Sequence, residues 1–366
     1  MAKGMWIGVG SVAKKVSKMY IGVGGVARKV KKAYIGVNGV ARCFFSSGEL
    51  SYYGTATAFS ANRHNYAATT IGNYALFGGG QTASSTYSSV VEAYNKSLVK
   101  STPTALSVSR YNLRATSNAS YALFAGGYTS SYKNTVDAYN SSLTRSTPST
   151  LSSIRDGMGA ARVGGYALFA GGGNSGGYTN VVEAYNASLT KTTPTALSFS
   201  NNIDASASVG SYALFAEVGS AGTTNAYNAS LARSTPATLG FSGSDINATT
   251  VGNYAIFAGE DDSNTVVSYN SSLTKSTISG LSVSRRDVGA TTVGDYALFA
   301  GGRTGTGSSA ANSNVVDAYD ASLVRTTTNS LSSALQRPEA ASVGDYAIFA
   351  ANRYGSVLSP DVYQVI

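Results

Sequence analysis

The chain of 366 residues contains 43% hydrophobic residues, 41 glycines and 25 tyrosines but one cysteine and one histidine, and its formal net charge is +9. This composition supplies enough apolar material for a core and favours strands joined by turns over helices. It excludes an intrachain disulfide and a zinc site built from Cys and His, and no apolar run of about 18 residues is present for membrane insertion.

The first element is a basic arm, which we place at residues 1–46. Residues 1–43 hold nine basic residues and no acid, whereas the rest of the chain holds 18 basic and 18 acidic residues. The whole net charge therefore lies on the arm, and attraction to an anionic partner belongs to this segment.

The opening apolar run of the arm is interrupted by glycine and is too short for a secretory signal, so we expect no export by that route.

The arm consists of a fourteen-residue repeat that is written almost three times, as in "YIGVGGVARKVKKAYIGV". Two-residue turn signals recur every seven residues, and Asn38-Gly39 between valines is the strongest of them. Two or three glycines per copy would penalise a helix by about 1 kcal/mol each. We predict six short antiparallel strands, with Trp6 opposite Lys15 and Val9 opposite Val12. A coiled coil of two heptads per copy is the alternative.

A ribbon of this size cannot bury itself, so we expect the arm to dock on another surface or on copies of itself. The three aromatic residues that open the repeats and the neighbouring basic residues are the predicted docking residues. These are Trp6, Tyr20, Tyr34, Lys14, Lys15, Arg28, Lys29, Lys31 and Lys32.

Residues 47–366 contain seven copies of a longer repeat, each marked by two tyrosines. The first tyrosine opens "YALF" or "YAIF", at positions 74, 121, 166, 212, 254, 296 and 346. The second usually lies in "AYN", at positions 94, 139, 185, 227, 269, 319 and 363. The unit of 42 to 50 residues has the length of a four-stranded propeller blade.

Each unit is predicted to hold an inner strand, the "YALFAGG" strand, a "NVVDAY" strand and an outer strand rich in Ser and Thr. The last unit ends after three strands, at "DVYQVI". Residues 50–63 align with 97–110, which form an outer strand, so we predict that residues 50–59 complete the seventh blade beside Tyr363. Closure of the ring in this way removes the open sheet edges.

This repeat resembles a Kelch-type blade over residues 47–366, because a glycine pair follows the second strand and a tyrosine lies in the third. The pair is present at Gly126 and Gly127, for example, and at Gly301 and Gly302. The tryptophan expected after the tyrosine is absent from every blade, and the glycine pair is lost in "YALFAEVGS" and "YAIFAANRY". The resemblance implies an all-β, seven-bladed, Kelch-like β-propeller, here preceded by a basic β-repeat arm.

All variation in unit length falls between the second and third strands. The distance between the two tyrosines of a unit varies from 15 to 23 residues, whereas the distance to the next unit is always 27. In a propeller these loops share a face with the connections from each outer strand to the next blade. We expect the binding surface on this variable face.

Four of these connections carry an arginine at a matching offset, and Asn201, Gly243 and Leu335 stand there in the other three. A partial ring of guanidinium groups at the channel mouth would grip carboxylates, phosphates or sugar hydroxyls. The alternative, which we favour, is that each arginine hydrogen-bonds carbonyls of an adjacent blade. With their neighbours, the candidate binding residues are Arg63, His64, Arg110, Tyr111, Arg155, Arg285 and Arg286.

The tyrosines divide into two groups. Those in "YALF" and "AYN" are predicted to be core residues. The others are candidates for stacking on sugars or proteins. They are Tyr87, Tyr111, Tyr128, Tyr132, Tyr178 and Tyr354.

We predict no enzyme, because His64 is the only candidate base for a nucleophile triad and no nucleophile elbow accompanies it. A copper site would need several histidines. Three acids at residues 260–262 are more typical of a solvated turn than of a cation site. The recurrent "NAS" and "NSS" segments are predicted to be Asx turns rather than glycan acceptors. We expect no metal and no cofactor.

The glycine, valine and lysine repeats of the arm also resemble the opening segments of tail and other virion proteins from phages of Gram-positive bacteria. This resemblance implies a structural protein of the virion, assembled in the host cytoplasm and present in several copies. The arm would bind other virion proteins, and the propeller loops would bind a host glycan, a surface protein or another virion protein. The alternatives are a nucleic-acid-binding protein that uses the basic arm and a carbohydrate-active enzyme with two carboxylates.

Overall fold

The computed structural model describes most of the chain as strands and turns. The described residues are 6–9, 12–15, 19–23, 26–30, 32–37, 40–46, 48–83, 85–217, 219, 222–241, 245–260, 263–305, 310–350 and 359–366. Every regular element within these ranges is a β-strand, and none of the described residues forms a helix long and apolar enough to cross a membrane.

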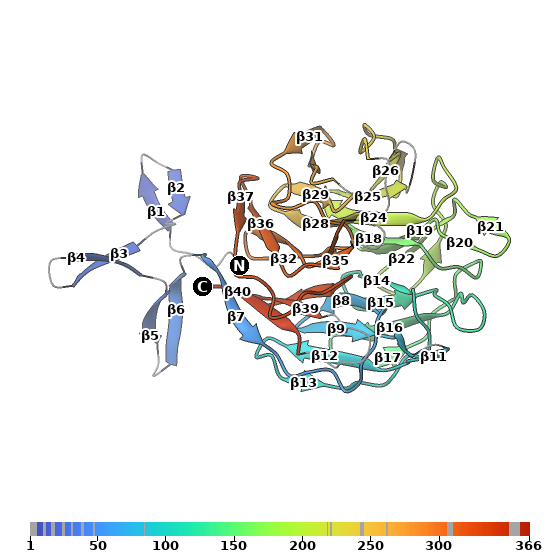
Figure 1. The fold of residues 1–366 in the computed structure, drawn as a ribbon, viewed down its shortest axis with the longest axis horizontal. Coiled ribbons are helices and arrows are strands. Elements are labelled where there is room, and N and C mark those ends of the chain that lie inside the picture. The colour runs from blue at the N-terminus through green and yellow to red at the C-terminus, as the bar shows by residue number, and fades with distance from the viewer. Residues whose placement is uncertain are drawn as a thin grey trace.

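Seven four-stranded antiparallel sheets form a ring, which confirms the predicted seven-bladed β-propeller (Figure 1). The innermost strands are β8 (Ala67–Ile71), β14 (Arg114–Ser117), β18 (Gly159–Val163), β24 (Ile203–Val209), β28 (Asn247–Val251), β32 (Gly289–Val293) and β38 (Glu339–Val343). The second strands are β9 (Tyr74–Gly78), β15 (Tyr121–Ala125), β19 (Tyr166–Ala170), β25 (Tyr212–Glu217), β29 (Tyr254–Ala258), β33 (Tyr296–Ala300) and β39 (Tyr346–Ala350).

The third and outer strands follow in the same order, and blades 1 to 7 are numbered by their second strands. The third strands are β12 (Val91–Asn95), β16 (Val136–Asn140), β22 (Val182–Tyr185), β26 (Thr224–Asn228), β30 (Val266–Asn270), β36 (Val316–Asp320) and β40 (Asp361–Val365). The outer strands are β13 (Lys100–Ser101), β17 (Arg145–Ser146), β23 (Lys191–Thr192), β27 (Arg233–Ser234), β31 (Lys275–Ile278), β37 (Arg325–Thr327) and β7 (Leu50–Thr55).

The ring closes through its own beginning, as predicted. Strand β7 pairs with β40, and Tyr52 lies opposite Tyr363 in this ladder. Main-chain hydrogen bonds between Glu49 and Ile366, at 2.9 and 3.0 Å, extend the pairing to the last residue. The closing strand ends at Thr55 rather than at residue 59, but the predicted partner and direction are confirmed.

The core consists of seven apolar clusters, one between each pair of neighbouring blades. In each cluster the phenylalanine of "YALF" and the tyrosine of the third strand face the preceding blade. Tyr139 is fully buried, and its hydroxyl donates to the carbonyl of Thr104 in blade 1 at 2.7 Å. The seven equivalent hydroxyls bind the preceding blade in the same way, so these tyrosines join blades as well as filling space.

One part of the core prediction is wrong. The tyrosine that opens each "YALF" segment is half-buried, because it stands at the end of the second strand beside the turn. It packs against the edge of a cluster and is not enclosed by it.

The outer strands are shorter than their Ser/Thr-rich segments predict, and proline explains their length. Where Pro103, Pro148, Pro194 or Pro236 follows, the outer strand has two residues. Proline has no N–H for the ladder. Ile278 stands at the proline position of blade 5, and there the strand extends to four residues.

The predicted Asx turns are present between the third and outer strands. The Oδ1 of Asn140, for example, accepts hydrogen bonds from the main-chain N–H groups of Ser142 and Thr144, both at 2.9 Å. Leu143 in this turn has a φ of 61°, a left-handed conformation that bulky residues rarely adopt. Five other blades place a leucine in this conformation at the same position, where its side chain packs against the apolar cluster.

The arm forms three antiparallel hairpins, which confirms the six predicted strands and excludes the coiled coil within the described residues. Their strands are β1 (Trp6–Val9), β2 (Val12–Lys15), β3 (Met19–Val23), β4 (Val26–Val30), β5 (Lys32–Val37) and β6 (Val40–Ser46). Trp6 pairs with Lys15 and Val9 with Val12, as predicted. Tyr20 pairs with Lys29 in the second hairpin and is 56% exposed. The turn residues, Lys31 among them, lie outside the described residues.

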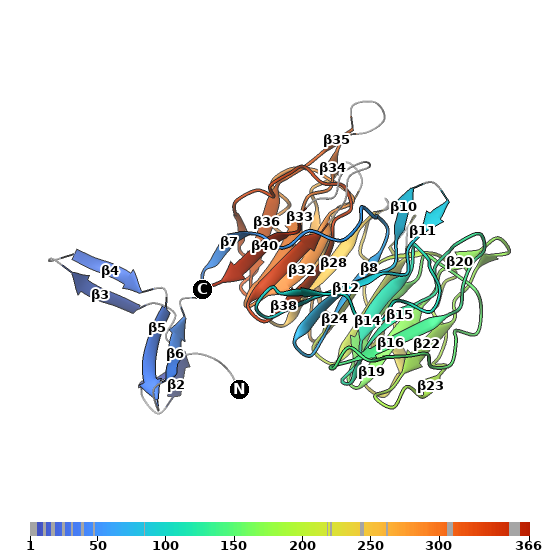
Figure 2. The ribbon, with the colours of Figure 1, turned by 90° about the horizontal axis from the view of Figure 1, so that it is seen from below.

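The arm and the variable face lie at opposite ends of the blades. Thr55 of the closing strand lies opposite Asp361, which follows the loop between the second and third strands. The other end of the ladder adjoins Asp345, in the turn that joins the first two strands of blade 7. The arm continues from this second end, and Figure 2 shows its hairpins away from β10 (Gln81–Ala83), β11 (Thr86–Tyr87), β20 (Gly173–Asn174), β34 (Arg303–Thr304) and β35 (Ala311–Asn312) of the variable loops.

Candidate binding site at the channel mouth

The four arginines of the connections are fully buried and paired with acids. Arg110 Nη2 lies 2.8 Å from Asp137 Oδ2, and the exposed fraction of each side chain is 0%. The equivalent pairs, each at 2.7 Å, are Arg63 with Glu92, Arg155 with Glu183 and Arg285 with Asp317. The acid lies on the third strand of the blade that follows the connection.

The connections that carry Arg110 and Arg155 are attached to the blades on both of their sides. The carbonyl of Arg110 accepts a hydrogen bond from Gly80 of blade 1, at 2.8 Å. Its guanidinium group donates to Phe124 and Asp137 of blade 2. A β-carbon at Gly79 would lie 2.7 Å from the carbonyl of Arg110, so the glycine pair permits this approach.

Burial lowers the pKa of Arg110, Arg155 and Arg285, and the attraction of the paired acid opposes this shift. Burial alone would raise the pKa of Glu92, but Arg63 and hydrogen bonds from Ser60, Arg63 and Lys100 outweigh it and lower the pKa. Because these guanidinium groups are enclosed by protein, they are not available to a ligand. The geometry supports the favoured alternative, in which the arginines brace neighbouring blades.

In each blade whose connection carries the arginine, the third strand also carries the acid. The connection with Asn201 has Asn225 at the acid position, and blade 5, whose connection has no arginine, has Val267 there. In blade 7, where Leu335 replaces the arginine, Asp361 accepts a hydrogen bond from Tyr52 at 2.7 Å instead. Charge is therefore buried at this position only together with a donor.

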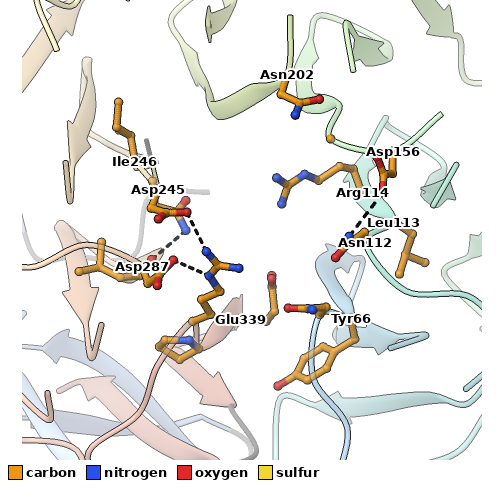
Figure 3. A pocket seen from close by; sticks show the side chains of 16 residues that line it. Tyr66, Asn112, Leu113, Arg114, Asp156, Asn202, Asp245, Ile246, Asp287 and Glu339 are labelled. Carbon is orange, nitrogen blue, oxygen red and sulfur yellow. Dashed lines mark hydrogen bonds and ion pairs between the residues drawn. The ribbon is translucent and has the colours of Figure 1, made fainter. Parts of the chain in front are cut away.

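A cavity of about 330 Å³ lies at the channel mouth on the variable face, one to four residues beyond the arginine positions (Figure 3). All seven connections contribute to its lining. The residues two positions beyond the arginine offset have φ between 49° and 64° in six of them, which turns the main chain into the channel. These residues are Asn65, Asn112, Gly157, Asp245, Asp287 and Arg337.

One side of the cavity is formed by a cluster of paired charges. Arg337 pairs with Asp245, at 2.8 Å, and with Asp287. Gln336 also donates to Asp287, at 3.2 Å. These side chains therefore pair with one another at the rim of the cavity.

The other side presents Arg114 and Glu339, the first residues of β14 and β38, on either side of blade 1. Arg114 Nε donates to the carbonyl of Met158 at 2.8 Å, and its guanidinium group points into the cavity (Figure 3). The carboxyl group of Glu339 also points inward, and it has no hydrogen-bond donor among the described residues. Burial raises the pKa of Glu339 to about 7, although Arg114 and Arg337 oppose the shift.

Small side chains line the channel below this level. A second space of about 170 Å³ shares Arg114, Asn247 and Glu339 with the cavity above. The residue of each inner strand that lies opposite the phenylalanine of the second strand forms its wall, and these residues are Ala68, Ala115, Ala160, Ser206, Ala248, Ala290 and Ala340. The channel therefore continues beyond the polar side chains of the cavity between small side chains.

Four of the candidate tyrosines form a cluster over blades 1 and 2. Tyr87 and Tyr111 are stacked with ring centroids 5.4 Å apart and an angle of 3°. Tyr128 packs edge-on against Tyr111 and against Tyr132, at 5.8 and 4.9 Å. Burial raises the pKa of Tyr111, and the charge of Asp156 at the cavity rim adds to the effect. Tyr111 directly precedes Asn112, which lines the cavity, so the cluster adjoins the cavity. Tyr178 is exposed elsewhere on this face, and Tyr354 lies outside the described residues.

The remaining candidates, His64 and Arg286, lie in the connections beside the variable loops. His64 pairs with Gln81, and Arg286 pairs with Arg303, as isolated bridges. Burial lowers the pKa of His64, and Arg286 donates to the carbonyl of Gly305 at 2.9 Å. These bridges confirm that connections and loops share one face.

Sequence reasoning missed the residues that line the cavity. Their signal is the recurrence of Asn, Gly or Asp, which tolerate a left-handed backbone, two residues after the arginine position. Arg114 and Glu339 have no repeated signal, because the equivalent positions in four other blades hold Ala or Gly. Among the described residues no group of three metal-ligating side chains is present. Of the acids at residues 260–262, only Glu260 lies within the described part.

Comparison of the sequence with protein-family models gave no match, and comparison with curated proteins gave no significant match. The fold and the geometry of the variable face therefore carry the functional argument.

Proposed function

We propose that this protein is a non-enzymatic binding protein of a larger assembly, in which the arm attaches the chain and the Kelch-like propeller presents its variable face to a partner. The observation that carries the proposal is that the arm and the variable face lie at opposite ends of the blades. The arm continues from one end of the blades, and the variable loops, the tyrosine cluster and the channel-mouth cavity lie at the other. An attached molecule of this kind exposes its binding face to the surroundings.

The assembly that we propose is a bacteriophage particle. The resemblance of the arm to opening segments of virion proteins supports this, as does its threefold repetition in one register. The partner of the propeller is then a glycan on the host surface or a second virion protein. Half-buried tyrosines beside a polar cavity support a glycan, because aromatic rings stack on sugar rings while amides and carboxyls bind hydroxyl groups.

The test is the composition of particles released by the bacterium that makes the protein. We expect the full-length chain in purified particles by mass spectrometry, and we expect its loss when Trp6, Tyr20 and Tyr34 are all changed to Ala. A matched control changes three exposed propeller residues, Val99, Val283 and Val324, to Ala, and this variant is expected to remain. Absence of the wild-type chain from the particles would contradict the proposal.

One observation favours a second function, the binding of nucleic acid. Nine cations and no acid lie in residues 1–43, and such a segment binds phosphates with a steep dependence on salt. A gel shift of the full-length chain with duplex DNA that disappears between low and moderate salt would support this function. Retention of the arm on particles at the same moderate salt would support attachment by packing instead.

A further inference from the structure

We infer that the channel-mouth cavity binds a small hydroxylated amine, of which an amino sugar is the form found in cell-surface glycans. The inference rests on the proposed function, because it names the ligand of the variable face. It is carried by the shape of the cavity, by its charges and by one half-buried carboxyl group, that of Glu339, which has no donor among the described residues.

The first argument is size and enclosure. The cavity holds about 330 Å³, at the lower end of the range of about 300–1,000 Å³ for small-molecule sites. Because every connection of the ring contributes to its lining, the cavity is formed by the scaffold rather than by one loop. It therefore suits a single sugar-sized ligand or the terminal residue of a longer chain.

The second argument is the mixture of polar groups. Asn65, Asn112 and Asn202 line the cavity, and each amide both donates and accepts hydrogen bonds. A hydroxyl group has the same double capacity, so adjacent hydroxyls on a ring match this lining. The Nδ2 of Asn112 also donates to Asp156 at 3.4 Å, which orients that carboxyl group at the rim.

The third argument is charge. Four carboxyl groups and two guanidinium groups line the cavity, so the lining has an excess of negative charge. The pairing of Arg337 with Asp245 and Asp287 occupies one guanidinium group. An anionic ligand would face this excess, whereas an ammonium group would complement it.

The position of the ammonium group follows from Glu339. Its half-buried carboxyl group points into the cavity and has no donor among the described residues, so a ligand can reach it (Figure 3). A ligand ammonium beside Glu339 would supply that donor as a charge-assisted hydrogen bond. The hydroxyl groups of the ligand would then meet the asparagines, and Arg114 would donate to them from the side.

The experiment uses the full-length protein and three probes that differ in charge: glucosamine, glucose and glucuronate. Binding is measured by saturation-transfer NMR and calorimetry at pH 7. We expect glucosamine to bind with a dissociation constant of about 1 mM or lower, about tenfold more tightly than glucose. Glucuronate is expected to bind more weakly than glucose.

The variant Glu339→Gln tests the position of the ammonium group, because it keeps the size of the side chain and removes its charge. We expect it to abolish the preference for glucosamine over glucose. Asp345→Asn is the matched control, because it removes an exposed carboxyl group from the same blade at the opposite end, and it is expected to retain the preference. Asp156→Asn is a second cavity variant, with a smaller expected loss.

Two results would overturn the inference: no saturable binding of glucosamine to the wild-type protein, or a preference that survives Glu339→Gln. Equal or tighter binding of glucuronate would also contradict it. These results leave the proposed function standing if the chain is present in particles. Absence from particles together with selective glucosamine binding would instead refute the proposed assembly and retain the site.

Discussion

Buried arginines show how single residues hold neighbouring blades at fixed distances. The main chain of Arg110 is bonded to blade 1 and its side chain to blade 2, where Asp137 also accepts the N–H of Ser107 at 2.9 Å. Blade 4 has the same arrangement without charges, because the N–H of Ser198 donates to Asn225 at 3.0 Å. At this position the propeller thus uses an ion pair in blade 2 and neutral hydrogen bonds in blade 4.

This comparison predicts what happens when the ion pair of blade 2 is replaced by the neutral residues of blade 4. Arg110→Asn leaves Asp137 buried without its main partner, and we expect the free energy of unfolding to fall by about 3–5 kcal/mol. The double variant Arg110→Asn with Asp137→Asn copies blade 4 and is expected to regain more than half of the loss. Urea denaturation of all four proteins of the cycle gives the coupling energy. Additive effects of the two substitutions would contradict the bracing role.

Glu339 gives a second prediction at this scale, on the dependence of stability on pH. The pKa of Glu339 is raised to about 7 in the folded protein, from an ordinary value of about 4.3. The folded state therefore binds the proton more tightly, and the stability contributed by this group falls as the pH rises from about 4.3 to 7. We expect Glu339→Gln to raise the unfolding temperature above pH 7 and to leave it nearly unchanged below pH 4.

The control for this measurement is Asp345→Asn, which removes an exposed carboxyl group from the same blade. It keeps Glu339 in place, so the decrease in stability that Glu339 contributes between about pH 4.3 and 7 is expected to persist in this variant. If Glu339→Gln gave a constant difference in unfolding temperature across this range, the carboxyl group would have an ordinary pKa in the folded protein.

Among the elements, the closing strand β7 is joined to the rest of the seventh blade by one ladder. The Glu49 and Ile366 main-chain groups exchange two hydrogen bonds at its end. Deletion of residues 365 and 366 removes both of these bonds and the pairing of Leu50 with Val365. We expect a loss of about 1–3 kcal/mol, from about 0.5–1.5 kcal/mol for each hydrogen bond.

The measurement is thermal or urea unfolding of the full chain with and without the two residues. A version that keeps residues 365 and 366 and adds two serines after them is the control for the position of the terminus. Equal stability of the shortened and the native chain would show that the ring does not depend on this end of the ladder.

The elements were predictable from sequence because their signals are local and occur seven times. Glycine turns, Asx turns and the two tyrosines of each unit fixed the strand order, and the alignment of residues 50–63 with 97–110 identified the closing strand. The length of the outer strands was not predicted, although the prolines that end them are visible in the sequence. The half-burial of the "YALF" tyrosines depends on the neighbouring blade, which no local pattern describes.

The site was less predictable, because the direction of a side chain decides it. The arginines were identified at the right positions, but their burial depends on acids 27 to 32 residues later, Glu92 and Asp317 among them. The shared presence of an arginine and an acid in blades 1, 2, 3 and 6 was available in the sequence as a sign of pairing. Arg114 and Glu339 line the same cavity only because blades 7 and 2 flank blade 1 in the closed ring.

At the scale of the whole molecule, the propeller has two ends with different properties. The described parts of the variable loops and the cavity belong to one end, and the arm continues from the other. The constant spacing of 27 residues between units belongs to the outer strands and the connections that must join one blade to the next. The scaffold thus restricts the length of one half of each unit and leaves the loops of the other half free to change.

The strand that closes the ring is continuous with the arm, and this has a mechanical consequence. Tension on the arm reaches the propeller first at Glu49, where the ladder with Ile366 begins. Hydrogen bonds of an antiparallel ladder run across the strands, so a pull along β7 strains all of them together in shear. A sideways pull opens them one after another, and the propeller withstands force best when its tether is aligned with that strand.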